Sequence, residues 1–289
     1  MIRWIVLGIT ASFLVGFIVG AKKIFPYEPI RSSYLIAHSK MKQEVSAIKN
    51  FSSCTIEEIK NVPNSSTAFI GHAYGSSSKN NFIAKNVSNF IEKNSHLLSS
   101  IVFTGDVFVV PSSEKWLQLE EIGSDLRIYV APGNHDVLRA DSREIFERSV
   151  YGQIKFPRTI NTSLGKVILE DSTSTKWTVS TETIDMLNAN QNETNIVARH
   201  NIPIVELLEF ANSPAGLGDD LDTLPSLKSK IKSGKTIWII GDTGYAPHHP
   251  RLKCLSSENH MFVMNGIGEV QGDTVLIAAD GNLYSYIIK

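Results

Sequence analysis

The chain has 289 residues, of which 42% are hydrophobic and 20% are charged, so it can bury a full core and is neither disordered nor collagen-like. Its 28 basic residues against 29 acidic ones leave a net charge of -1, which excludes the basic surface of a nucleic-acid-binding protein. A mean hydropathy of -0.04 excludes a polytopic membrane protein.

The first expected element is an apolar run. Residues 4–21 carry no charge, and Lys22 and Lys23 follow them. As a helix this run would span about 27 Å, close to the bilayer core of about 30 Å, so residues 1–23 are expected to form a single-pass membrane anchor. A cleavable signal peptide stays the alternative, although the length of the run favours an anchor. Positive charges balance across the run, so the side of the membrane is undecided.

Residues 24–63 are polar and are expected to form a juxtamembrane stalk, followed by one catalytic domain over residues 64–289. Short apolar runs predict strands, and helical spacing of apolar residues between them predicts helices at 79–94 and 114–122. The strands are expected at 67–70, 101–104, 127–131, 167–170, 195–198, 236–240, 261–264, 274–279 and 283–288. Strands that alternate with helices predict an α/β fold.

The only two cysteines are Cys54 and Cys254, which lie far apart in the sequence. They form no C-x-x-C pair, which excludes a zinc ribbon, and two residues cannot make a disulfide scaffold. One disulfide between them remains open.

Three of the predicted strands end in polar residues. His72 follows the first strand, Asp106 follows the second, and the tetrapeptide Gly-Asn-His-Asp at residues 133–136 follows the third. Ligands of α/β sheets collect at the carboxyl ends of strands, and a glycine before each of these residues permits close backbone approach. We therefore expect these side chains to form one site.

These residues give the chain a resemblance to the calcineurin-like metallophosphoesterases. That family carries Asp-x-His, Gly-Asp-x-x-Asp/Asn, Gly-Asn-His-Asp/Glu, a lone His and Gly-His-x-His, each after a strand of a β-sandwich flanked by helices. Asp106 and residues 133–136 match the second and third motifs, and His200 matches the lone His. Asp171 and Asn265 also follow strands where the family places an Asp and an Asn. The resemblance implies that sandwich over most of the chain after the anchor.

The chain departs from the family pattern at the first, second and last motifs. His72 and Tyr74 stand in place of Asp-x-His, Val109 replaces an Asp or Asn, and Asp242 takes the place of a histidine. An imidazole thus replaces a carboxylate at one motif and a carboxylate replaces an imidazole at another, so the donor charge is nearly conserved. A rearranged two-metal site and the loss of one metal both remain open. Two histidines at 248 and 249 could supply a missing ligand.

The resemblance implies a divalent metal site and a proton donor beside it. One or two ions of Mn, Fe, Zn or Mg suit the oxygen and nitrogen donors. His135 is expected to protonate the leaving oxygen or to stabilise charge on the phosphoryl group, with Asp136 orienting its ring. The implied metal ligands are His72, Asp106, Asn134, His200 and Asp242.

The sequence therefore predicts a membrane-anchored, metal-dependent phosphoesterase that hydrolyses a phosphate mono- or diester. Its expected partners are a phosphorylated substrate of unknown class and the membrane, with no nucleic acid. The alternative is a catalytically inactive metallophosphoesterase-like protein that binds or scaffolds in the cell envelope, which the changes at residues 72, 74, 242 and 244 favour.

Overall fold

The computed structural model describes residues 50–75, 81–122, 126–190, 193–211, 221–232, 234–243, 252–269 and 271–289. The predicted anchor, most of the predicted stalk and the two histidines at 248 and 249 lie outside these residues. Within the described ranges, no helix combines the length and the hydropathy that a membrane span requires.

The described chain alternates strands and short helices. The strands are β1 (Ser52–Ser53), β2 (Glu57–Ile59), β3 (Ser66–Ile70), β4 (Leu98–Phe103), β5 (Arg127–Val130), β6 (Arg158–Thr162), β7 (Gly165–Leu169), β8 (Asn195–Arg199), β9 (Thr236–Ile240), β10 (Lys253–Ser257), β11 (His260–Met264), β12 (Thr274–Ala279) and β13 (Asn282–Ile287). The helices are α3 (Lys85–Asn94), α4 (Ser113–Ile122), α5 (Asn134–Val137), α6 (Ala140–Arg148), α7 (Thr181–Ala189), α8 (Val205–Ala211) and α9 (Leu224–Lys230), with a 3-10 helix η1 (Ser95–Leu97).

The strands form two mixed sheets. One has seven strands in the order β1-β10-β11-β9-β8-β7-β6, and the other has six in the order β2-β13-β12-β3-β4-β5. In the first, β7, β8, β9 and β11 run parallel to one another; in the second, β3, β4 and β5 do. Every residue of β3 and β12 is buried, as expected for central strands that are covered on both faces.

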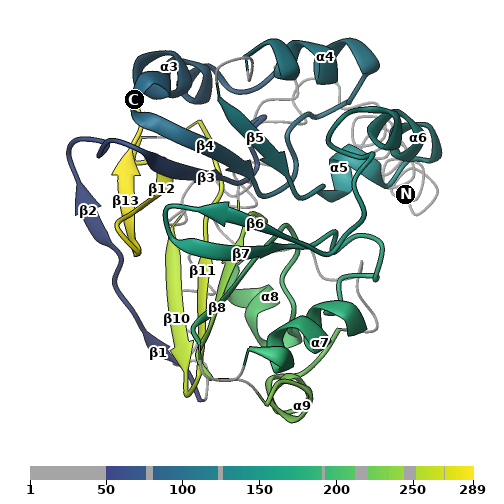
Figure 1. Cartoon of the computed structure of the whole chain (residues 1–289), viewed down its shortest axis with the longest axis vertical. Helices are drawn as coiled ribbons and strands as arrows, with labels where there is room; N and C mark the ends of the chain where they lie inside the picture. The colour runs from purple at the N-terminus through teal and green to yellow at the C-terminus, as the bar shows by residue number, and fades with distance from the viewer. Residues whose placement is uncertain are drawn as a thin grey trace, which may run out of the picture. The chain divides into compact units, whose positions relative to one another are not determined.

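Buried side chains fall into three layers. One cluster joins the two sheets and includes Phe69 of β3 and Ile239 of β9. A second packs α3 and α4 on the six-stranded sheet through Phe90 and Trp116, and a third packs α7 on the seven-stranded sheet through Leu187. Figure 1 shows the corresponding helices on the outer side of each sheet. The predicted α/β fold is confirmed as two mixed sheets flanked by helices.

The predicted strands are all present, with ends that differ by at most three residues. The helix predicted at 79–94 begins only at Lys85, because residues 81–84 form a bend before it. Its buried residues, Val87, Phe90, Ile91 and Asn94, have the spacing of one helix face.

The folded part begins before the predicted boundary at residue 64. β1 pairs with β10 and β2 pairs with β13, so both belong to the sheets although the sequence analysis assigns residues 24–63 to a stalk. Between them, Cys54 forms a disulfide with Cys254 of β10, across a sequence separation of 200 residues. The disulfide ties the start of the described chain to the seven-stranded sheet.

Candidate functional site

The carboxyl ends of the parallel strands of both sheets meet at one place. His72 follows β3, Asp106 follows β4, Asn134 begins α5 after β5, and His200 follows β8. The main chain of Ile267, beyond β11, donates to the carbonyl of Gly71 over 3.0 Å, which links the two sheets at this edge. Ligand sites of α/β sheets form at such ends.

The carboxylate of Asp106 stands at the centre of the site. Its Oδ1 lies 3.4 Å from Nε2 of His200, and its Oδ2 lies 3.8 Å from Nε2 of His72. Oδ1 also accepts the backbone N–H of His135 over 2.9 Å. The three side chains are 4% exposed or less, so each imidazole faces one oxygen of a single buried carboxylate.

Both histidines are held by their other ring nitrogen. Nδ1 of His200 lies 2.9 Å from the carbonyl of Thr104, and Nδ1 of His72 lies 3.2 Å from the carbonyl of Ile267. A carbonyl only accepts hydrogen bonds, so Nδ1 carries the hydrogen in each ring. The Nε2 atom of each ring therefore faces Asp106. Histidines that bind metals are commonly held in this way, with a backbone carbonyl at one ring nitrogen and the other ring nitrogen left for the ion.

Asn134 and Asp242 complete the neighbourhood of His200. The Oδ1 of Asn134 lies 3.2 Å from Nε2 of His200. The backbone N–H of Asp242 donates to the His200 carbonyl over 3.1 Å, and the negative charge of Asp242 acts on the His200 ring. His200 thus lies among three side chains that carry oxygen acceptors.

These oxygens make the imidazole of His200 a strong base. Burial would lower its pKa, but the charge and hydrogen bond of Asp106, together with the charge of Asp242, raise the pKa of His200 to about 9. Burial would raise the pKa of Asp106, but the imidazoles, His200 foremost, hold it well below its ordinary value. Both shifts favour a protonated His200 beside an ionised Asp106, so this position favours a positive charge.

The main chain at the site adopts conformations that side chains rarely take. His72 has a φ of 53° and Asp106 a φ of 54°, both in the left-handed region. Such residues cost about 1–3 kcal/mol each and cluster at functional sites. At Gly105, with a φ of 86°, an added Cβ would overlap the ring of His200. At Gly133 it would overlap the carboxylate of Asp106, so these glycines let the strand ends approach the site.

The loop that carries His200 is anchored by the residue before it. The guanidinium of Arg199 is fully buried, and its Nη1 donates to Oε2 of Glu170 over 2.6 Å. Its Nε donates to the carbonyl of Asn201 over 2.8 Å. A buried charge that is fully hydrogen-bonded holds its loop in one geometry.

His135 lies at the edge of the site, against Tyr74. The hydroxyl of Tyr74 lies 3.4 Å from Nε2 of His135, and the Tyr74 ring lies between the rings of His72 and His135, with centroids 4.2 Å and 5.1 Å away. Nδ1 of His135 lies 3.2 Å from the carbonyl of Val109. The carbonyl of Val109 therefore fixes the His135 ring, with Nε2 towards the Tyr74 hydroxyl.

Asp136 does not make the contact with His135 that the resemblance implies. Its buried carboxylate accepts the backbone N–H groups of Val107, Phe108 and Gly133 instead. Burial and the charge of Asp106 raise the pKa of Asp136 to about 6, although these N–H groups act in the opposite direction. Asp136 thus joins the loop after β4 to the loop after β5.

The donor set fits a divalent ion in chemical kind. Two imidazole nitrogens, a carboxylate and an amide oxygen suit Mn, Fe or Zn. Two ligand atoms that each lie about 2.1 Å from the same ion are roughly 3.0–3.4 Å apart. Nε2 of His200 lies 3.2 Å from Oδ1 of Asn134 and 3.4 Å from Oδ1 of Asp106, which agrees with this spacing. The 3.8 Å between Nε2 of His72 and Oδ2 of Asp106 is wider. Among the described residues, no group of three or more His, Cys, Asp or Glu side chains is disposed to hold an ion by itself.

The two weaker sequence signals have structural partners outside this set. Asp171 forms an ion pair with Arg143, Oδ2 to Nη1 at 2.7 Å. The side chain of Asn265 exchanges hydrogen bonds with Thr274 on β12. Sequence reasoning missed the carbonyls that orient the three histidines, because a backbone carbonyl has no residue signature.

No protein-family model matches the chain, and no curated protein matches it.

Proposed function

We propose that the chain is a membrane-anchored, metal-dependent phosphoesterase of the calcineurin-like type, which hydrolyses a phosphate mono- or diester. One observation carries the proposal: two buried histidines bind backbone carbonyls through Nδ1 and turn Nε2 to opposite oxygens of Asp106. Two mixed sheets flanked by helices, with this site at the ends of their parallel strands, are what the resemblance implies.

The ligands of a divalent ion would be Asp106, Asn134 and His200, with His72 and Asp242 beside them. When bound, such an ion supplies Lewis-acid chemistry, which neutralises charge on a phosphoester and makes a water molecule easier to deprotonate. Asp106 can serve two ions or one, because its oxygens face different histidines. Asn134 adds a neutral oxygen that leaves the net charge of the ligand set unchanged.

His135 would hold the proton that the leaving oxygen needs. The carbonyl of Val109 fixes its Nδ1, so Nε2 is the atom that can deliver a proton, and a positioned acid of this kind contributes about 10²–10⁴-fold. The hydroxyl of Tyr74 contacts the same Nε2 and keeps the ring aligned.

The disulfide supports an oxidising compartment as the location of the domain. Disulfides persist in oxidising compartments and are rare in the cytosol. If residues 1–23 anchor the chain, the Cys54–Cys254 bond supports a catalytic domain on the oxidising side of that membrane.

A second candidate function is an inactive binding or scaffolding protein of the cell envelope. One observation favours it: the hydroxyl of Tyr74 lies 3.4 Å from Nε2 of His135, the atom that would otherwise have to contact a leaving oxygen. In that case the chain would bind a phosphorylated ligand without turning it over.

The test is a hydrolysis assay on the full chain purified in detergent, with p-nitrophenyl phosphate and bis(p-nitrophenyl) phosphate and with Mn²⁺, Zn²⁺ or Mg²⁺. The proposal expects metal-dependent release of p-nitrophenol that Asp106→Asn abolishes. The matched control is Asp185→Asn, at an exposed position of α7, and it should retain wild-type turnover. Metal binding without hydrolysis of either ester would favour the scaffolding protein, and equal activity in both variants would exclude this site.

A further inference from the structure

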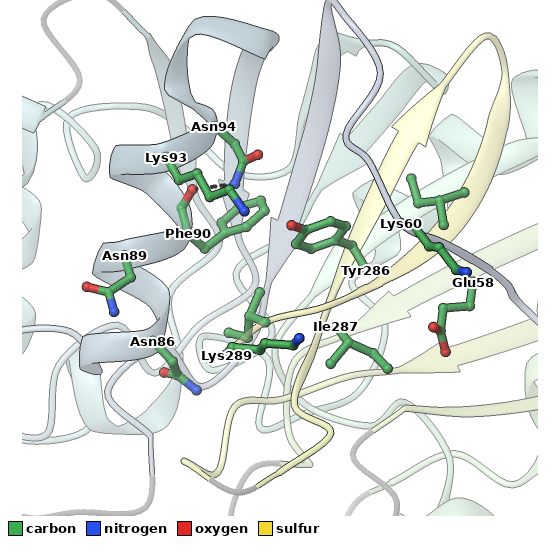
Figure 2. A pocket seen from close by; sticks show the side chains of 12 residues that line it. Glu58, Lys60, Asn86, Asn89, Phe90, Lys93, Asn94, Tyr286, Ile287 and Lys289 are labelled. Carbon is green, nitrogen blue, oxygen red and sulfur yellow. Dashed lines mark hydrogen bonds between the residues drawn. The ribbon is translucent and has the colours of Figure 1, made fainter.

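A cavity lies beside helix α3 and shares no residue with the site described above. Its volume is about 520 Å³, within the roughly 300–1,000 Å³ of small-molecule pockets. α3 forms one wall, β2 and its following residue another, and the end of β13 a third (Figure 2). The cavity is therefore built by three segments that are far apart in the sequence.

The inner part of this cavity is apolar. Phe90 of α3 and Ile288 are each 4% exposed, and both belong to the core under the six-stranded sheet. The ring of Tyr286 lies 5.7 Å from that of Phe90, centroid to centroid, and remains half-buried at the surface. A ring that is partly exposed in a cavity offers a flat face to a ligand.

The rim of the cavity is strongly positive. Lys60, Lys93 and Lys289 line it, against a single carboxylate, Glu58. Figure 2 shows Lys93 and Lys60 on either side of Tyr286, with Lys289 between them in the view. The lining side chains therefore carry a charge of +2, three lysines less one glutamate, in a chain whose net charge is -1.

The three ammonium groups are not used by the fold. Within the part of the chain that the structure describes, none of them forms a hydrogen bond or an ion pair. Lys93 lies in the last turn of α3, where the helix dipole favours a cation.

The amides of the cavity divide into two kinds. Asn86 donates to Asp273 and Asn94 donates to the carbonyl of Phe90, so both serve the fold. Asn89 lies on the same helix, lines the cavity and is exposed. Its amide can both donate to and accept from a hydroxyl group.

We propose that this cavity binds a small sugar phosphate that carries at least two negative charges. Lysines recognise phosphate as point charges, Asn89 serves a sugar hydroxyl, and the Tyr286 ring covers an apolar sugar face. The juxtaposition that carries the assignment is three otherwise unused lysines around one cavity with an aromatic wall. It does not depend on the proposed activity.

The test is calorimetric titration of the full chain in detergent, with EDTA present, using fructose 1,6-bisphosphate. Binding should be measurable and should weaken as salt rises. Lys60→Gln, Lys93→Gln and Lys289→Gln should each reduce affinity at least about fivefold. Lys166→Gln, at an exposed position of β7, is the matched control and should bind like the wild type. Glu58→Gln should bind more tightly, because it removes the one acidic side chain among the lining residues.

Two further probes separate the parts of the proposal. Uncharged fructose should not bind, and Tyr286→Leu should weaken fructose 1,6-bisphosphate more than inorganic pyrophosphate, because pyrophosphate has no sugar face. A thermal melt of each variant shows that it is folded. Absence of binding to the folded wild type would overturn the proposal. An equal loss of affinity in the three cavity variants and in the control variant Lys166→Gln would overturn it too.

Discussion

Oδ1 of Asp106 lies 3.4 Å from Nε2 of His200, and both side chains are buried where the loops after β4 and β8 meet. Since Nδ1 of His200 faces the carbonyl of Thr104, Nε2 is the atom that a cation-binding role would use. The geometry at this pair is set by the backbone as much as by the two side chains, and the first prediction follows from that.

Gly105→Ala should disrupt the site beyond the cost of its backbone conformation. Gly105 has a φ of 86°, and an added Cβ would overlap the His200 ring. The control is Gly165→Ala, with a φ of 104° and nothing within 4 Å of the added Cβ. We expect about 1 kcal/mol of destabilisation for the control and at least about 2–3 kcal/mol for Gly105→Ala in urea unfolding. Equal losses would show that His200 is not held against residue 105.

His135→Ala should separate metal binding from turnover. The imidazole of His135 lies beside the Asp106 cluster and contacts Tyr74 and Val109, so its removal should leave bound metal in place. Turnover of the preferred nitrophenyl ester should fall by about 10²–10⁴-fold, the contribution of a positioned acid. His96→Ala, at an exposed position of η1, should change neither quantity. Unchanged turnover in His135→Ala would remove His135 from the reaction.

The strands were predictable because most are continuous apolar runs, such as β9 and β12, whose bounds agree with the predicted ones. β1 and β2 were missed because they are two and three residues long and largely exposed, so only their pairing with β10 and β13 identifies them. The short helices α7 and α9 owe their starts to Ser180 and Thr223, which accept backbone N–H groups at the first turn.

The side chains of the candidate site could be named from motifs, whereas their orientation could not. His72, Asp106, Asn134 and His200 come together at the strand ends, as the order of the motifs led us to expect. The ring orientations depend on carbonyls of Thr104, Val109 and Ile267, which any residue type would supply. Tertiary contacts of the main chain are therefore the part that the motifs do not encode.

Removal of the disulfide should destabilise the domain. A Cys54→Ser, Cys254→Ser double variant loses a crosslink across 200 residues, and loss of a native disulfide costs about 2–5 kcal/mol. Thermal melts should show a lower Tm for the double variant, and the wild type should melt like the variant in a strong reductant. If the wild type carries two free thiols when it is isolated from cells without reductant, the proposed oxidising location is wrong.

Acid should destabilise the protein through His260. Burial first, and then the charge of Lys228, lower the pKa of His260 to about 4, with Glu258 acting in the opposite direction. Nδ1 of His260 accepts the indole N–H of Trp238 over 3.3 Å, which needs the neutral ring. The ordinary pKa of a histidine is 6.5, so between pH 6.5 and about 4 the His260 ring binds a proton in the unfolded chain but not in the folded chain.

Stability should therefore fall as pH falls through this window, with His260 contributing up to about 1.4 kcal/mol per pH unit. His260→Gln should be less stable at neutral pH but should lose less stability between pH 6.5 and 4 in urea unfolding. His96→Gln is the matched control and should keep the wild-type dependence. A steeper loss in His260→Gln would contradict this role.

The metal content of the full chain tests the central claim most directly. After equilibration with Mn²⁺ or Zn²⁺ and removal of free ion, elemental analysis should give at least one ion per wild-type chain. Asp106→Asn and His200→Ala should give none, and His96→Ala should give the wild-type value. A wild-type chain that is folded and retains no divalent ion, or a His200→Ala chain that retains the wild-type amount, would contradict the assignment of this cluster as a metal site.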